Sequence, residues 1–376
     1  MRVLMISKAC VTASYRTKLA YLNSYEDLDM GLVVPDHWGS LPFESDPRDE
    51  EYAIFKQKIM LNGHNHFHWY PQLDEAIEAF NPDLIHIDEE HYSFVTMRAV
   101  RMANRLDIPS VFFTWQNLDK NYPWPFSNFE QRVFSGTVAG IAGNQEARDI
   151  VVRKGFTKPV AIIPQFGTDL SLFEPRDRHE MRDRYEIRHQ FVVGFVGRLI
   201  EDKGIGDLLR AMEEPLRDDP GMSLLFVGEG DFKAQIQEWM RDTGLGPQTI
   251  FLPWVTSGTM VDVTNLMDVL VLPSRTTKRW KEQFGRVLTE AMACGVVVIG
   301  SNSGEIPHVI GDAGMVFAEG DAKALQSVIL HMRNNPEDYK KYQQRGLERV
   351  AMHFSQEAIA RKTEAFYRTL WGGTSE

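Results

Sequence analysis

The chain has 376 residues, of which 43% are hydrophobic and 25% are charged, and its formal net charge is −11. This composition is typical of a folded protein of about two domains, and it excludes disordered, collagen-like and coiled-coil chains. The acidic balance argues against nucleic acid as a partner, because nucleic-acid binding depends on a net positive surface. Cys10 and Cys294, the two cysteines, are too few for a disulfide framework and lack the spacing of a zinc site.

The first apolar run, residues 3–6, is too short for a signal peptide and is followed closely by Lys8. No window approaches the roughly 18 apolar residues of a transmembrane helix. We therefore expect a cytoplasmic protein without a transmembrane segment. Peripheral contact with a membrane stays open.

Short apolar strands alternate with amphipathic helices through the first half of the chain. We expect strands at residues 3–6, 32–35, 84–87, 110–114, 139–142 and 160–163. We expect helices between them at residues 15–23, 74–80, 95–106, 131–134 and 145–154. This alternation indicates βαβ units and a parallel sheet buried on both faces.

A linker is predicted at residues 164–175, which contain two prolines and a glycine, and the alternation then restarts. The second half has expected strands at 191–196, 223–227, 249–252, 269–272 and 296–300. Its expected helices are 204–212, 232–243, 285–294, 325–333, 336–354 and 356–370. The sequence thus predicts an α/β protein with two Rossmann-like, doubly wound parallel-sheet domains, at residues 1–170 and 171–355.

Two segments at strand ends carry residues suited to binding a phosphorylated sugar compound. Gly197, Arg198 and Lys203 follow the strand at 191–196 and precede a helix that begins near Ile205, so a phosphate there would meet two cations and a helix N-terminus. A solvated loop is the alternative interpretation.

The second segment contains two glutamates with seven residues between them. We expect Glu282 in the loop before a helix that starts near Gly285, with Glu290 about one and a half turns into that helix. Carboxylates accept hydrogen bonds from neighbouring hydroxyl groups, so Glu282 suits a sugar and Glu290 a ribose diol. An amphipathic helix with two surface glutamates is the alternative.

Together these motifs resemble family 4 of the retaining glycosyltransferases. The resemblance rests on Gly-Arg-Leu at 197–199 with Lys203-Gly204, Gly-Glu-Gly at 228–230, Glu282 and Glu290 in their setting, and Ser-Gly-Glu-Ile-Pro at 303–307. It implies the GT-B fold, in which two Rossmann-like domains face a central cleft. It also implies that the last helix, within 356–376, packs back on the first domain.

The resemblance implies a retaining hexosyltransferase that uses a UDP- or GDP-linked sugar, with the donor on the second domain and the acceptor on the first. Glu282, Arg198 and Lys203 would serve catalysis. The same three residues would bind the donor together with Gly197, Val255, Phe284, Gly285 and Glu290.

The acceptor side is expected at the ends of strands in the first domain. Its candidate residues are Lys8, Tyr15, Arg16, Asp88 and Gln116. Arg16 could alternatively belong to a polar helix face. Gln116 stands where members of the family often have a histidine. The acceptor would be the hydroxyl group of a sugar, a lipid-linked sugar or a small molecule.

No Asp-x-Asp pair follows a strand of the second half, so we expect no metal site and no cofactor beyond the nucleotide-sugar co-substrate. Two other functions stay open. A nicotinamide dehydrogenase would share the fold, but the first strand leads into Ser7-Lys8-Ala9-Cys10 without the G-x-G-x-x-G motif. A noncatalytic nucleotide-sugar-binding protein would share the motifs.

Overall fold

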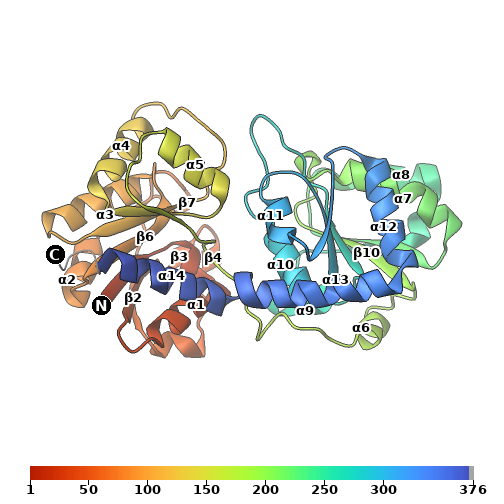
Figure 1. Ribbon diagram of the computed structural model, residues 1–376, viewed down its shortest axis with the longest axis horizontal. Coiled ribbons are helices and arrows are strands. Elements are labelled where there is room, and N and C mark those ends of the chain that lie inside the picture. Colours follow the sequence, from red (N-terminus) through yellow and green to blue (C-terminus); the bar gives the residue numbers. More distant parts are fainter. Residues whose placement is uncertain (372–376) are drawn as a thin grey trace. The chain divides into compact units, whose positions relative to one another are not determined.

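The computed structural model describes residues 1–371, which divide into two units. Unit 1 consists of Met1–Gly167 together with the described residues from Gln356 on, and unit 2 is Thr168–Ser355. The sequence analysis placed the division between residues 170 and 171. Helices and strands alternate in each unit, as Figure 1 shows.

Unit 1 is built on a seven-stranded parallel sheet. In spatial order the strands are β5 (Ala53–Gln57), β2 (Asp29–Pro35), β1 (Arg2–Ile6), β6 (Leu84–Glu90), β7 (Ser110–Thr114), β8 (Ala139–Ala142) and β9 (Val160–Ile162). A short antiparallel pair, β3 (His37–Trp38) and β4 (Leu41–Pro42), lies between β2 and β5 in the chain. With the β3–β4 pair left out of the numbering, the first six strands along this sheet follow the order 3-2-1-4-5-6 of a doubly wound fold. The sequence predicted the doubly wound fold but not this order.

Alternating side chains of the unit 1 sheet enter two different cores because successive residues of a strand point to opposite faces. Val3 and Met5 of β1 pack in a core with the helices α1 (Ala13–Asn23) and α14 (Gln356–Trp371). Leu4 and Ile6 pack on the opposite face. That face is covered by α2 (Leu73–Phe80), α3 (Phe94–Arg105), α4 (Phe126–Gly136) and α5 (Gln145–Arg153).

The last helix, α14, supplies part of the unit 1 core although the whole of unit 2 separates it from Gly167 in the chain. Ile359, Ala360 and Tyr367 are fully buried. The side chain of Gln356 ties the start of the helix down, because it accepts a hydrogen bond from the Gly167 amide at 3.2 Å and donates one to the Ser14 carbonyl at 2.7 Å. Unit 1 is therefore assembled from two separate stretches of chain.

Unit 2 repeats the same strand order in a six-stranded parallel sheet. The strands are β12 (Thr249–Leu252), β11 (Met222–Val227), β10 (Phe191–Val196), β13 (Val269–Leu272), β14 (Val297–Ser301) and β15 (Gly314–Phe317). One face packs against α7 (Ile205–Asp218), α8 (Lys233–Thr243) and α12 (Ala322–Asn334). The remaining helices are α6 (Arg178–Arg184), α9 (Ser257–Thr264), α10 (Arg286–Ala293), α11 (Ile306–Ile310) and α13 (Pro336–Arg349). A π-helical turn, Val350–Phe354, follows α13.

Four strands escaped the sequence analysis: the short pair β3 and β4, and the edge strands β5 and β15 of the two parallel sheets. The charged residue Lys56 interrupts the apolar pattern of β5, which pairs only with β2. β15 is short and begins with Gly314. Both sequences depart from the continuous apolar run that marks a strand buried on both sides. None of the helices within residues 1–371 is long and apolar enough to cross a membrane.

Candidate functional site

The loops at the carboxyl ends of the unit 2 strands are held together by close backbone contacts at glycines. Gly204 lies between β10 and α7 with φ of +68°, and a Cβ atom there would meet the carbonyl oxygen of Pro273 at 1.9 Å. At Gly304, where φ is +52°, a Cβ atom would lie 2.0 Å from the carbonyl oxygen of Glu282. Any larger residue would force these loops apart. Gly204 therefore brings the loop after β10 against the loop after β13, and Gly304 brings the loop after β14 against that same loop.

An ion pair joins two of the predicted site residues across these loops. The Lys203 Nζ atom lies 2.7 Å from Glu282 Oε2, and the Ser274 hydroxyl donates to the same oxygen at 3.0 Å. The Lys203 Nζ atom also lies over the Trp280 ring, 4.7 Å from the ring centroid. Glu282 and Ser274 are buried. We call Lys203, Glu282, Ser274 and Trp280 the lysine–glutamate cluster.

The helix α10 begins where the sequence analysis placed it. Gly285 is the N-cap, with φ of +81°, and the helix runs from Arg286 to Ala293. Glu290 is buried one turn into it and pairs with the Nε atom of Arg286 at 2.9 Å. Burial raises the pKa of Glu290, and the nearby Arg286 opposes that rise. Glu282 thus lies in the loop before the helix and Glu290 within it, as predicted.

Other predicted donor residues differ in their surroundings. Arg198 is exposed, and no hydrogen bond or ion pair within residues 1–371 involves its guanidinium group. Val255 is half-buried in the segment after β12. Phe284 is buried and contacts Phe354, with 5.6 Å between ring centroids. Gly197 follows β10 directly, at the same strand end as Arg198.

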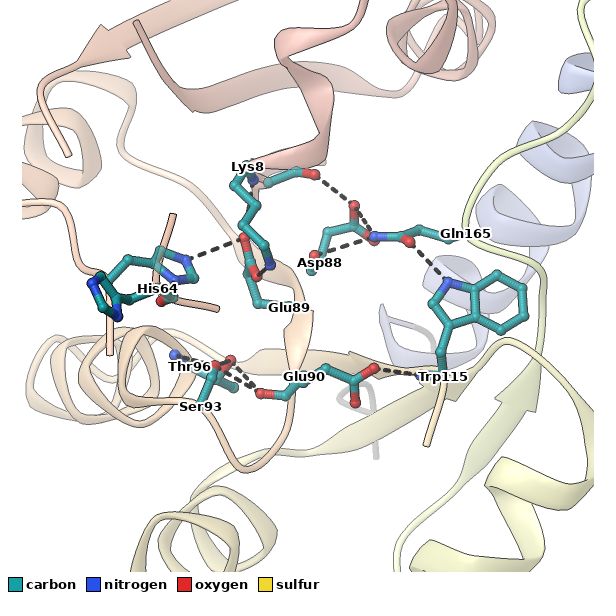
Figure 2. Close-up of polar contacts among 11 residues, drawn as sticks. Lys8, His64, Asp88, Glu89, Glu90, Ser93, Thr96, Trp115 and Gln165 are labelled. Carbon is teal, nitrogen blue, oxygen red and sulfur yellow. Dashed lines mark hydrogen bonds and ion pairs between the residues drawn. The ribbon is translucent and has the colours of Figure 1, made fainter. Parts of the chain in front are cut away.

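In unit 1, Asp88 is the centre of a buried hydrogen-bond network at the end of β6 (Figure 2). Its Oδ2 atom accepts hydrogen bonds from the Ser7 hydroxyl at 2.7 Å and from Gln165 Nε2 at 2.9 Å. Gln165 in turn accepts a bond from the indole N–H of Trp115 at 2.9 Å. Burial raises the pKa of Asp88 to about 6, although Lys18 and the two hydrogen bonds oppose the rise.

Replacing Asp88 with asparagine is expected to reverse part of the pH dependence of stability. The folded pKa of about 6 lies above the ordinary value of 3.8, so this group stabilises the fold below pH 3.8 and loses that contribution as pH rises through 6. The unfolding free energy of Asp88→Asn, relative to the parent, should therefore rise by about 2–3 kcal/mol from pH 4 to pH 7. Urea unfolding at both pH values measures it, with the exposed Asp74→Asn as control. A constant difference would contradict the expectation.

The next residue, Glu89, forms an ion pair with Lys8 in the loop after β1. Its Oε1 atom also accepts the Lys8 backbone N–H at 3.0 Å and lies 3.6 Å from His68 Nε2. Burial alone would raise the pKa of Glu89, but Lys8 and His68 outweigh it and lower that pKa to about 2. Figure 2 shows Lys8 lying against Glu89. Sequence reasoning named Lys8 as an acceptor candidate but did not pair it with Glu89.

Arg16 corrects an expectation, because it neither forms a polar helix face nor reaches solvent. It is 2% exposed; its Nε atom pairs with Asp49 at 2.7 Å and its Nη1 donates to the Cys10 carbonyl at 2.7 Å. Its charge is satisfied inside unit 1. Arg16 is therefore not carried forward as an acceptor residue.

Tyr15 and Gln116, the other acceptor candidates, also contact their own unit. Tyr15 stacks on Phe166 at 4.2 Å between ring centroids. The buried Gln116 donates its amide N–H to the Leu118 carbonyl at 2.5 Å. Sequence reasoning missed Ser7, Gln165, Ser274 and Trp280. Each lies within three residues of a strand end or of a residue it did name, which is the signal that could have identified them.

No group of three or more histidine, cysteine, aspartate or glutamate side chains within residues 1–371 is arranged to hold a metal ion. Asp88 Oδ2 and both Glu89 oxygens make the contacts described above. The third carboxylate of β6, Glu90, accepts bonds from the Thr114 hydroxyl at 2.7 Å and the Trp115 backbone N–H at 2.9 Å.

Residues 177–349, nearly all of unit 2, match the family model described as glycosyl transferases group 1. The chain is therefore similar to glycosyltransferases of the family 4 type. The resemblance predicted from the motifs is thereby confirmed. The lysine–glutamate cluster and α10 both lie within the matched residues of this glycosyltransferase-like chain.

Curated relatives of the glycosyltransferase-like chain match over part of their length. It is 30% identical over 221 residues to a D-inositol 3-phosphate glycosyltransferase of Segniliparus rotundus, covering 57% of this chain and 48% of the relative. It is 30% identical over 183 residues to the capsular polysaccharide biosynthesis glycosyltransferase CapM of Staphylococcus aureus, covering 48% and 46%. The chain thus spans about half the length of the curated relatives it matches.

Solved structures show the same fold over the whole glycosyltransferase-like chain. Sucrose-phosphate synthase from Thermosynechococcus elongatus aligns with a TM-score of 0.74 and 20% identity, covering 100% of both chains. HepE of Anabaena in complex with UDP and glucose aligns with a TM-score of 0.72 and 16% identity, covering 98% of this chain and 100% of that one. The GT-B architecture of two Rossmann-like units is therefore confirmed.

Proposed function

We propose that the chain is a retaining hexosyltransferase that moves a hexose from a UDP- or GDP-linked donor to an acceptor hydroxyl. The observation that carries the proposal is the lysine–glutamate cluster, which joins a cation after β10 to a carboxylate before α10. A cation next to a hydroxyl-binding carboxylate suits a compound in which a phosphate is bonded to a sugar.

Each residue of the unit 2 site takes a distinct part in this proposal. Arg198 and Lys203 bind the diphosphate, Glu282 binds the transferred sugar and Glu290 binds the ribose. Gly197 and Val255 line the donor, and the backbone at Phe284 and Gly285 lies beside the sugar. The free N–H groups at the start of α10 add a positive partial charge for the diphosphate.

The chemistry we propose follows from the charge that develops as the donor breaks. The bond between the sugar carbon and the diphosphate oxygen breaks, and the acceptor oxygen bonds to the same face of that carbon. The leaving diphosphate oxygen takes the acceptor proton, and the two cations stabilise its growing negative charge. No carboxylate nucleophile is needed.

The names of similar proteins support both UDP-linked and GDP-linked sugars as donors. One relative carries the name GDP-mannose-dependent phosphatidylinositol monomannoside mannosyltransferase, and HepE was solved with UDP and glucose. A nucleoside diphosphate release assay, with UDP- and GDP-sugars and mixed hydroxyl acceptors, tests the proposal. Donor binding without any release would favour the noncatalytic alternative, which the occupied amide of Gln116 also favours.

The two glutamates are expected to differ in what their loss changes. Glu290→Ala removes a ribose contact made in ground state and transition state alike, so nucleoside diphosphate affinity should fall about tenfold or more. Glu282→Ala removes a sugar contact and frees Lys203, so turnover should fall about a hundredfold while that affinity holds or rises. Calorimetry with the free nucleoside diphosphate and steady-state kinetics separate the effects. An equal loss of affinity in both variants would contradict this division of roles.

Chelation is expected to leave turnover unchanged. The proposal neutralises the diphosphate with Arg198, Lys203 and the N-termini of α7 and α10. Initial rates in excess EDTA should match those with Mg²⁺ or Mn²⁺ added. Loss of activity on chelation, with recovery on adding either cation, would show that protein charge alone is insufficient.

A further inference from the structure

The acceptor end of unit 1 lies where the order of its strands reverses. β1 pairs with β2 on one side and with β6 on the other, and ligands of doubly wound sheets bind at the carboxyl ends of such strands. Ser7 and Lys8 directly follow β1, while Asp88, Glu89 and Glu90 close β6. The charges of these residues therefore decide which acceptors fit.

The cations near this point already have partners inside unit 1. Lys8 pairs with Glu89, which is fully buried. Lys18 is 2% exposed and donates from Nζ to the Gln165 carbonyl at 2.7 Å. Arg16 is buried against Asp49. The segment after β1 thus carries three positive side chains, and each of them already has a hydrogen-bond or ion-pair partner inside unit 1.

At the carboxyl ends of β1 and β6, carboxylate groups outnumber the nearby cation Lys8. Lys8 has 19% of its side chain exposed and Glu90 has 25%, so solvent reaches both. Asp88 is 2% exposed, and its Oδ1 atom has no hydrogen-bond partner within residues 1–371. Carboxylate oxygens only accept hydrogen bonds, so they favour hydroxyl donors and repel the charge of about −1.5 to −2 on a phosphate monoester.

We propose that the acceptor is an uncharged polyhydroxyl compound, and that Glu89 determines this specificity by neutralising Lys8. The proposal rests on the proposed function, because it concerns the acceptor of that reaction. It makes Glu89 a specificity residue that acts through Lys8 and does not itself contact the acceptor. Removing its charge would free an ammonium group at the strand switch for phosphate.

Inorganic phosphate is the probe, used with the full chain saturated by whichever of UDP or GDP raises its melting temperature. Calorimetry should give weak phosphate binding to the parent protein and at least tenfold tighter binding to Glu89→Gln. Glu90→Gln removes a charge from the same strand without contacting Lys8 Nζ and should stay within twofold of the parent. Lys8→Met, combined with Glu89→Gln, should abolish the gain, which separates this site from exposed cations such as Lys120.

Lys8→Met alone keeps the test decisive if Glu89→Gln does not fold. The proposal predicts that this variant binds phosphate as the parent does, because the parent's Lys8 is already neutralised. Loss of phosphate binding in Lys8→Met, or no gain in a folded Glu89→Gln, would overturn the proposal. Failure of both UDP and GDP to bind would instead overturn the proposed function.

Discussion

Tyr367→Ala is expected to lower the unfolding free energy of unit 1 by about 3–5 kcal/mol, the range for removing a buried aromatic side chain. Tyr367 is fully buried in the core shared by β1, α1 and α14. Its hydroxyl lies 2.5 Å from the buried His86 Nδ1 atom, so its loss also leaves a polar group on β6 without that partner. The loss is a large part of the roughly 5–15 kcal/mol that stabilises a typical domain.

Urea unfolding monitored by amide hydrogen exchange distinguishes the stability of unit 1 from that of unit 2. The amides of β1 and β6 should exchange faster in Tyr367→Ala, whereas those of β10 and β13 should keep their protection. Tyr367→Phe isolates the hydroxyl and should cost about 1–3 kcal/mol. Arg361→Ala, at an exposed position of the same helix, should change stability by less than about 0.5 kcal/mol. Similar stability in Tyr367→Ala and Arg361→Ala would show that α14 contributes little to the unit 1 core.

Arg198→Ala is expected to reduce turnover about a hundredfold or more, which corresponds to about 2.7 kcal/mol of activation free energy. The guanidinium is exposed and has no protein partner within residues 1–371, so its loss leaves no buried charge behind and should not affect folding. A planar group with several N–H donors matches the oxygens of a diphosphate. The cost should therefore appear in kcat, where charge develops on the leaving group.

Steady-state nucleoside diphosphate release measures this effect. Arg241→Ala, an exposed arginine in the last turn of α8, serves as the matched control. Lys203→Ala should lose a similar factor but also leaves Glu282 without its ion pair, so its melting temperature must be compared as well. Full turnover in a folded Arg198→Ala would remove this residue from the diphosphate site.

The two sheets and the start of α10 were predictable because their signals are local. Buried parallel strands such as β10 and β13 are continuous apolar runs, and Gly285 marks the helix start by a conformation that favours glycine. The edge strands β9 and β12 keep enough of that pattern to be predicted, whereas β5 contains Lys56 and β15 is short and begins with Gly314. For this reason β5 and β15 were found only in the structure.

The sequence predicted residues of the site but not which side chains contact each other. Lys203 and Glu282 were both predicted for the site, although no pattern showed that they contact each other. Arg16 was predicted for the acceptor side or a polar helix face, whereas its actual partner is Asp49 on a separate turn of the chain. Glu89 is one of three adjacent carboxylates at the end of β6, and its contact with Lys8 sets it apart from the other two. Such pairings depend on tertiary packing, which residue spacing does not encode.

The division of unit 1 into two stretches also dictates the order in which a ribosome can complete the folds. Roughly 190 residues of unit 2 are synthesised after Gly167 and before the first residue of α14. At about 5–20 residues per second, the nascent unit 1 waits about 10–40 s with the α14 side of its core uncovered. Unit 2 is continuous and is therefore the first that can close during translation. A chain that terminates early, or is cut near Ser355, would keep that unit while its partner stays open to aggregation and proteolysis.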